Sequence, residues 1–518
     1  MKFKKNGNNF ALFCLSAMFI FMGSSCLKQK VSLIIYNAHI YSLNSNQDSF
    51  DAMVVDGNKI CELGNYEELS KNYSSSQTMN AQGSYIFPGF FDGHTHYSDY
   101  AITLSQINLY GTNSFNEVLK KVAQYVAANP QEDFIIGHGW DQNLWSPAQF
   151  PNNKILNDLY PNKAIILNRI DGHAALVNQR AIELAHLDTQ SFVEGGLIQK
   201  NNGSLTGILI DKAIPLVSKI VPKETYQTLL KKMQIAEEIC LGYGLTAMSI
   251  CGITVYDALL LDSMYKNNSL NIRLQIFLSD NPESYSFLFS NTFKSNPKLK
   301  INGIKMYMDG ALGSRGASLM NRYSDDNSSG FLLQSFYHYD SIITLLKNSP
   351  FQLCTHAIGD SANRVILQLY NQYLTADNDR RWRVEHAQVV NADDVHYFKD
   401  RKIIPSVQPL HATEDMFWAP KRLGSQRLND AYRLKSLYEQ NGWIILGTDF
   451  PAGVPGPNPL RTYLSAVYRL NDSLQPIGGF RVEEALTPLE TMLGMTYWPA
   501  KGAFWEQEIG SLEIGKKA

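Results

Sequence analysis

The sequence predicts an α/β protein built on a closed parallel (β/α)8 barrel, the TIM barrel architecture, with a small β-sandwich-like unit and a long insertion after the first barrel strand. Eight short apolar segments alternate with longer helical patterns, which is typical of parallel strands joined by helices. Side chains that can bind metal stand at the ends of five of these segments. An open doubly wound sheet is the competing architecture. Because that sheet gathers its site at one switch point, we favour the barrel.

Residues 1–26 have the features of an export signal. A lysine-rich start precedes the apolar run 10–22, which is too short for a comfortable transmembrane helix. Small residues come directly before Cys26, as they do at the cleavage site of a bacterial lipoprotein. We therefore expect an exported bacterial protein of the cell envelope that is anchored by a lipid on Cys26. An ordinary periplasmic or secreted protein is the alternative.

Residues 31–87 predict the N-terminal part of the small β-unit. The segments 31–43, 51–64 and 84–90 are apolar and β-rich, and Asn, Asp and Gly turns separate them. We expect the chain to return to this unit over residues 496–518. Because the sequence stops after a β-like turn, we also expect the unit to be truncated.

The barrel itself is expected over residues 88–495. Its first strand leads into FPGFFDGHTH, where the spacing of His94 and His96 puts both imidazoles on one face of a strand. The interval before the second strand is far longer than a connection needs, so we expect an inserted lid over about residues 110–240. The other seven strands are predicted in the segments 244–250, 272–279, 299–310, 351–360, 381–388, 402–409 and 443–451.

Composition narrows the class of partner. The 518 residues carry a formal net charge of −2 and no long basic run, so we do not expect nucleic acid to bind. The six cysteines form no CxxC pair and no dense framework, so disulfides are not expected to hold the fold together. A small-molecule substrate is the expected partner, a homo-oligomer is left open, and membrane contact is expected only through the lipid.

The predicted strand ends carry one consistent chemistry. Isolated histidines are more often structural, but six metal-competent or modifiable side chains at five strand ends rarely coincide by chance. Neutral imidazoles and a carboxylate suit a divalent transition metal. The predicted metal ligands are His94, His96, Lys305, His356, His386 and Asp449.

An ordered series of motifs resembles the amidohydrolase superfamily, and within it amidohydrolase family 3, which includes N-substituted formamide deformylases. These motifs are FPGFFDGHTH, GHGWDQNLWSP, DGHAALVN, KMYMDGALGSR, THAIGD, RVEHAQ, SVQP and GTDFP. The resemblance extends from about residue 31 to the end of the chain, and it implies a metal-dependent hydrolase on a (β/α)8 barrel. Family members usually continue past GSLEIGK with another strand, which adds to the expectation of a truncated β-unit.

The resemblance also implies two metal ions, most simply zinc, although manganese and iron stay open. It assigns them to two ligand sets, the more buried ion to His94, His96 and Asp449 and the more exposed ion to His356 and His386. Lys305 would be carboxylated and would bridge both ions, because a buried lysine shifted toward neutrality can react with carbon dioxide. An unmodified Lys305 would leave a single metal, and a purely structural lysine would pair with Asp309.

The implied reaction is hydrolysis of a C–N bond in an amide, formamide or cyclic amide by metal-activated water. Asp449 would act as general base and pass the proton to the leaving amine. His173 would donate to the developing oxyanion, unless it only stabilises a turn. The expected substrate-binding residues are Trp140, Asp141, Arg315 and His411. For Trp140, packing within the insertion is the alternative.

Two other functions stay open. The same barrel supports a deaminase of an aromatic heterocycle, which a mononuclear centre would favour. A non-catalytic ligand-binding lipoprotein on a degenerate barrel is the alternative outside enzymology, but the complete ligand set argues against it. The identity of the substrate lies beyond the sequence, because such barrels reuse one metal centre under different loops.

Overall fold

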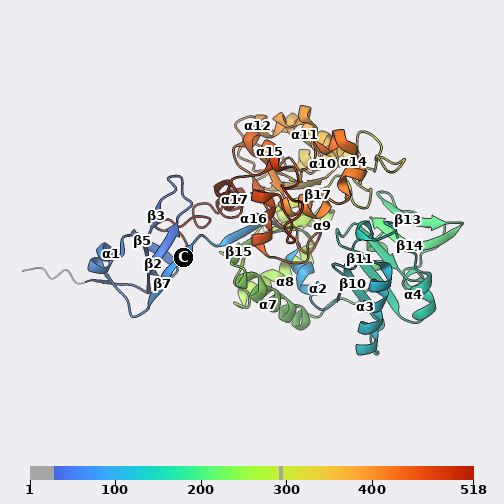
Figure 1. The fold of residues 1–518 in the computed structure, drawn as a ribbon, viewed down its shortest axis with the longest axis horizontal. Helices are drawn as coiled ribbons and strands as arrows, with labels where there is room; N and C mark the ends of the chain where they lie inside the picture. Colours follow the sequence, from blue (N-terminus) through green and yellow to red (C-terminus); the bar gives the residue numbers. More distant parts are fainter. Residues whose placement is uncertain (1–27, 291–295) are drawn as a thin grey trace, which may run out of the picture.

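The computed structural model describes residues 28–290 and 296–518. A small β-unit stands at one end, the barrel lies in the middle and the inserted unit covers the other side (Figure 1). The expected export signal and Cys26 lie outside the described residues, so export and lipidation stay predictions. Within the described part, no helix has both the length and the apolar character that a membrane crossing requires.

Eight parallel strands form the barrel, which confirms the predicted fold. Their order is β21-β20-β19-β18-β17-β16-β15-β8, so chain order and spatial order agree. The last and first strands approach closely, because a Cβ at Gly93 would lie 2.1 Å from Ile445 Cγ2. Only glycine fits there. The strands are β8 (Phe90–Thr95), β15 (Leu245–Ile253), β16 (Arg273–Ser279), β17 (Leu299–Tyr307), β18 (Gln352–Ala357), β19 (Arg383–His386), β20 (Ile404–Val407) and β21 (Ile445–Leu446).

Helices connect the strands and cover the outside of the barrel. Several begin at a polar cap, and the side chains of Thr254, Asn281 and Ser335 each accept a hydrogen bond from a free backbone N–H of the first turn. The helices that follow strand β15 and its successors are α8 (Val255–Lys266), α9 (Pro282–Phe289), α10 (Phe336–Leu346), α11 (Asp360–Tyr373), α12 (His396–Asp400), α13 (Pro409–Asp415), α14 (Ala419–Leu428), α15 (Leu434–Asn441), α16 (Pro459–Tyr468), α17 (Pro488–Gly494) and α18 (Tyr497–Gly502).

The long segment between β8 and β15 forms a second unit around its own six-stranded mixed sheet. The strand order is β13-β14-β12-β11-β10-β9, and two apolar clusters pack on its faces. Its elements are α2 (Tyr97–Thr103), β9 (Ile107–Asn108), α3 (Phe115–Ala128), β10 (Phe134–Trp140), α4 (Lys154–Leu159), β11 (Ala164–Arg169), β12 (Ala174–Val177), α5 (Gln179–Leu184), β13 (Gly196–Asn201), β14 (Ser204–Asp211), α6 (Pro215–Ser218) and α7 (Tyr226–Gly242).

The small β-unit contains a five-stranded sheet in which β2 is central. Near the end of the chain, Leu512 N donates to Ser42 O at 2.8 Å and Gly515 N donates to Ile60 O at 2.8 Å. The last residues therefore lie against this sheet (Figure 1). The elements of the unit are β1 (Gln29–Lys30), β2 (Leu33–Tyr41), β3 (Ser49–Phe50), β4 (Ala52–Asp56), β5 (Lys59–Gly64), α1 (Tyr66–Asn72), β6 (Tyr73–Ser74) and β7 (Thr78–Ile86).

The main apolar core lies between the barrel strands and their helices. The interior of the barrel is more polar. Gln275 on β16 accepts from the Ser249 hydroxyl at 2.8 Å and donates to Gln352 at 2.7 Å, and all three side chains are buried. Buried polar groups need hydrogen-bond partners, so we expect this hydrogen-bonded layer to be rigid. It lies below the carboxyl ends of the strands.

Candidate functional site

The predicted ligands meet at the carboxyl ends of the barrel strands. His94 lies on β8, Lys305 on β17, His356 on β18 and His386 on β19, and Asp449 follows β21. All five are buried. Parallel strands of a barrel end on one rim, so side chains far apart in the sequence converge there.

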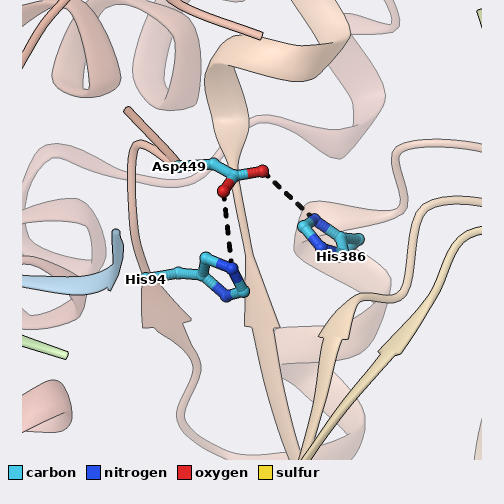
Figure 2. Close-up of side chains that lie close together, drawn as sticks. All are labelled: His94, His386 and Asp449. Atoms are coloured by element: carbon cyan, nitrogen blue, oxygen red, sulfur yellow. Dashed lines mark ion pairs between the residues drawn. The ribbon is translucent and has the colours of Figure 1, made fainter. Parts of the chain in front are cut away.

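Asp449 stands between the histidines. Its Oδ1 lies 3.4 Å from His94 Nε2 and 3.2 Å from His96 Nε2. Its Oδ2 lies 3.8 Å from His386 Nδ1 and 3.6 Å from His411 Nε2. Figure 2 shows the carboxylate placed between the rings of His94 and His386. Burial alone would raise the pKa of Asp449, but the positive potential of His94 and His96 holds it well below its usual value. Asp449 is therefore ionised.

Lys305 is fully buried beside these groups. Its Nζ lies 3.2 Å from His94 Nε2 and 4.9 Å from the centre of the Tyr307 ring. Burial lowers the pKa of Lys305, but the acidic groups around it, first Tyr307 and then the thiols of Cys354 and Cys251, outweigh burial and raise it. The expected shift toward neutrality is therefore wrong for the protein without metal. Without a cation nearby, Lys305 keeps its proton.

The structure places Asp309 beside His356 rather than in a structural pair with Lys305, which was the alternative to a carboxylated lysine. Asp309 Oδ1 lies 3.4 Å from His356 Nε2. The carboxylate also accepts backbone hydrogen bonds from Ser318, Ile358 and Gly359. Burial raises the pKa of Asp309 to about 7.

The donor set fits a divalent metal. Ligand atoms of His94, His386 and Asp449 lie within 4.8 Å of one another. Among residues 28–290 and 296–518, the buried atoms His356 Nε2 and Asp449 Oδ1 find no hydrogen-bond partner. Burial, together with the charges of His173 and Lys305, holds the pKa of His356 well below its usual value, so its imidazole is neutral. Neutral imidazole nitrogens and a carboxylate oxygen are ordinary ligands of such ions.

A cavity of about 180 Å³ opens above this cluster. Predicted residues that line it are His96, Asp141, His173, Lys305, His356, His386, His411 and Asp449. A wider hollow of about 600 Å³ adjoins it and shares His96, Asp171, His173 and Tyr307 with it. Together they give room for a small reacting group and a larger substituent.

Trp140 occupies a different place from the predicted one. Its side chain is 1% exposed and it is not among the residues that line the cavity. Its Nε1 donates to Leu167 O at 2.7 Å, and its ring packs against Trp145 at 5.8 Å between centroids. Trp140 therefore belongs to the core of the insertion, and the packing alternative describes it.

Arg315 also lies apart from the cavity lining. Its Nη2 pairs with Asp325 at 3.1 Å, and its backbone has a positive φ of 64°. The loop turns at this residue and directs the guanidinium to that carboxylate. The expected role of Arg315 as a clamp for substrate does not fit this position.

Arg169 is a cavity residue that the sequence reasoning missed. It is 1% exposed, forms ion pairs with Asp141 and Asp171 and donates to Gln142 at 2.8 Å. Both carboxylates also line the cavity. The sequence feature that could have identified Arg169 is a charged residue at the end of the apolar segment AIILNR. Because its charge is already paired, Arg169 fixes the wall of the cavity rather than offering a free cation.

His173 enters the site from the insertion. Its Nδ1 donates to Asp211 Oδ1 at 2.6 Å, and its ring centroid lies 5.2 Å from that of His356. Burial lowers the pKa of His173, but the hydrogen bond to Asp211 and the charge of that carboxylate raise it to about 8. Asp211 Oδ2 would lie 2.5 Å from a Cβ at Gly310, so the barrel loop leaves no space for the carboxylate to move there.

The contact between His173 and Asp211 should make the stability of the protein depend on pH. The pKa of His173 lies above its ordinary value of 6.5, so the pair contributes fully below about pH 6.5 and its contribution is lost as pH rises through about 8. We expect a loss of about 1–2 kcal/mol, measured as a fall in the midpoint of thermal unfolding between pH 6 and pH 9. In Asp211→Asn this fall should be smaller. An unchanged fall in that variant would contradict the assignment.

The match to a family model decides the family to which the chain belongs. The model described as "Amidohydrolase family" matches residues 77–518. The chain belongs to the amidohydrolase family. The matched range includes the barrel, the insertion and each residue of the predicted ligand set, and the family membership implied by the motifs is confirmed.

Several known proteins are similar to nearly the whole chain. Protein LONG AFTER FAR-RED 3 of Arabidopsis thaliana is 28% identical, with 94% of this chain and 86% of that protein covered. The putative amidohydrolase YtcJ of Bacillus subtilis is 27% identical, with 94% and 93% covered. The N-substituted formamide deformylase of Arthrobacter pascens is 21% identical, with 95% and 93% covered. Among solved structures, an uncharacterized metal-dependent hydrolase from Pyrococcus horikoshii is 26% identical, with a TM-score of 0.74 and 94% and 96% covered.

Proposed function

We propose that this amidohydrolase is a metal-dependent enzyme that hydrolyses a C–N bond in an amide, formamide or cyclic amide. One observation carries the proposal: in the described part of the chain, His356 Nε2 and Asp449 Oδ1 are buried without hydrogen-bond partners beside a shared cavity. A buried polar atom without a hydrogen bond costs free energy unless a bound ligand or ion contacts it. The metal-dependent hydrolase from Pyrococcus horikoshii and the formamide deformylase from Arthrobacter pascens support the proposal.

The residues that would hold metal are the set at the strand ends. His94, His96 and Asp449 form one group, and His356 and His386 form the other. A divalent ion, most simply zinc, supplies a Lewis acid and lowers the pKa of water when it is bound. The hydrogen bond of 2.7 Å between His386 Nδ1 and Gln408 Oε1 fixes that ring and leaves its Nε2 as the free nitrogen.

Lys305 would join the two groups after modification. The ammonium would first lose one proton, and the neutral Nζ would then attack the carbon of carbon dioxide and lose a second proton. The product would be a carbamate whose single negative charge is shared by two oxygens. Because Lys305 keeps its proton without metal, cations beside it are needed to lower its pKa and free the lone pair. Carboxylation and metal loading are therefore coupled in this proposal.

Asp449 and His173 would handle the protons of the reaction. Asp449 is ionised and faces the cavity, so it can accept a proton from the attacking water and return it to the leaving nitrogen. His173 lies beside His356 and is oriented by Asp211, and its Nε2 can donate to the oxygen that becomes negative. The carbon–nitrogen bond breaks as that nitrogen is protonated.

A substrate panel tests the proposal. Purified protein loaded with Zn²⁺ or Mn²⁺ is assayed with N-substituted formamides, N-acyl amines, cyclic amides, esters and amino-substituted heterocycles. We expect metal-dependent release of an amine and a carboxylic acid from at least one amide class. Release of ammonia from a heterocycle alone would show a deaminase instead. A metal-loaded protein that acts on nothing in the panel would favour the ligand-binding alternative.

A further inference from the structure

Below His94 lies a buried charged pair that is outside the ligand set. Arg383 and Glu385 both point into the barrel from β19 and are 1% and 0% exposed. Arg383 Nε donates to Glu385 Oε1 at 2.7 Å. Glu385 Oε2 contacts His94 Nδ1 and also accepts from the Ser406 hydroxyl at 2.8 Å. A buried ion pair is costly to form, so a pair retained here calls for a role.

The donors around Glu385 determine which nitrogen of His94 carries hydrogen. Arg383 has only donors, and its permanent charge keeps Glu385 as a carboxylate that can only accept. Nδ1 of His94 must therefore donate to Oε2. On the other side of the ring, Nε2 lies 3.4 Å from Asp449 Oδ1 and 3.2 Å from Lys305 Nζ, and both of these residues belong to the predicted ligand set. The contact with Glu385 therefore uses Nδ1 and leaves Nε2 directed toward the other predicted ligands.

The pair is itself held firmly. Arg383 Nη2 donates to Gly93 O at 3.1 Å, so Arg383 contacts the backbone carbonyl just before His94 and, through Glu385, its side chain. The guanidinium lies 4.7 Å from the centre of the Phe277 ring, and the sulfurs of Cys251 and Cys354 lie 3.7 and 3.5 Å from Nη2. Removing freedom from a ligand before binding lowers the cost of binding.

We propose that Arg383 and Glu385 are positioning residues that preset His94 for metal by fixing its tautomer and ring orientation. Ligating histidines commonly donate their second nitrogen to a carboxylate, and loss of that partner typically costs about 10–100-fold in metal affinity. The inference concerns the metal centre and so rests on the proposed function. His386, at the same rim, has the neutral amide oxygen of Gln408 as its hydrogen-bond acceptor. His94 instead has the charged carboxylate of Glu385.

The variant Glu385→Gln tests the inference. It keeps the size of the side chain but removes the charge and places an amide where two acceptor oxygens are needed. We expect the apparent dissociation constant for Zn²⁺, measured by competition with a coloured chelator, to rise about 10–100-fold. The matched control is Gln275→Met, which removes a buried polar group of the same barrel interior that contacts Ser249 and Gln352. It should lower the unfolding temperature of the metal-free protein and leave Zn²⁺ affinity within about twofold.

The outcomes separate the two proposals. Wild-type protein that binds no Zn²⁺ would overturn the proposed function. Wild-type binding with equal affinity in Glu385→Gln would overturn only the positioning role, as would an equal loss of affinity in Gln275→Met. If Glu385→Gln does not fold, Ser406→Ala removes one donor to the same carboxylate, and a loss of a few fold in Zn²⁺ affinity is expected. Unchanged affinity in that variant would then overturn the inference.

Discussion

Replacement of Asp449 by Asn is expected to lower kcat/KM by about 10³-fold on whichever amide proves to be hydrolysed. The amide has the shape of the carboxylate but cannot accept a proton, and general base catalysis alone is worth about 10²–10⁴-fold. Asp449 also lies within 3.8 Å of the nitrogens of His94, His96, His386 and His411, so its charge balances the whole cluster. Steady-state kinetics measure the loss, with metal content determined on the same samples.

A matched control for Asp449 is available at the edge of the same site. Asp99 lies 3.9 Å from His96 Nδ1, but its side chain is 67% exposed. Asp99→Asn also removes one negative charge, but at a position that is exposed to solvent. It should change kcat/KM by less than about threefold, because exposed charges are well screened. Equal effects of the two variants, or activity of Asp449→Asn within tenfold of wild type, would exclude Asp449 as the base.

Replacement of Lys305 by Ala is expected to lower the metal content from about two ions per chain to one or fewer and to reduce activity by about 10³-fold. Removal of the side chain takes away the only anionic bridge in the proposal and leaves a space in a fully buried part of the site. Metal analysis measures the stoichiometry, and native mass spectrometry detects the added carbon dioxide in wild type. Added short-chain carboxylates should restore part of the activity, because they can supply the two missing oxygens.

Lys300 provides the control for Lys305. It lies on the same strand, β17, but its Nζ donates to the carbonyl of Phe504 at 2.8 Å and faces Trp505, away from the cavity. Lys300→Ala should keep full metal content. Wild-type protein with one metal and no added mass would show that Lys305 is unmodified and that the centre is mononuclear. The same metal content in Lys305→Ala and wild type would remove Lys305 from the ligand set.

The repeated pattern of apolar strands was enough to predict the barrel. Parallel strands in a barrel are covered on the outside and filled on the inside, so they are short and buried on both faces, as in the fully buried β18. The rim position of His356 and His386 followed directly, because each closes such a strand. The insertion was visible only as excess length, and its six-stranded sheet depends on pairings between β12, β13 and β14 that turn signals indicate weakly.

By itself, the sequence determined the barrel, the order of its strands and the ligand-bearing strand ends, because these follow from local periodicity and from the rule that parallel strands end on one rim. Only the tertiary structure decided the partners of those ligands. The contact between His94 and Glu385 joins residues 291 positions apart, and the pair of His173 with Asp211 joins the residue before β12 to the end of β14. The tertiary structure also decided where the Arg315 side chain points and that Trp140 is buried. Such contacts depend on how units pack in space, and no periodicity along the chain encodes that packing.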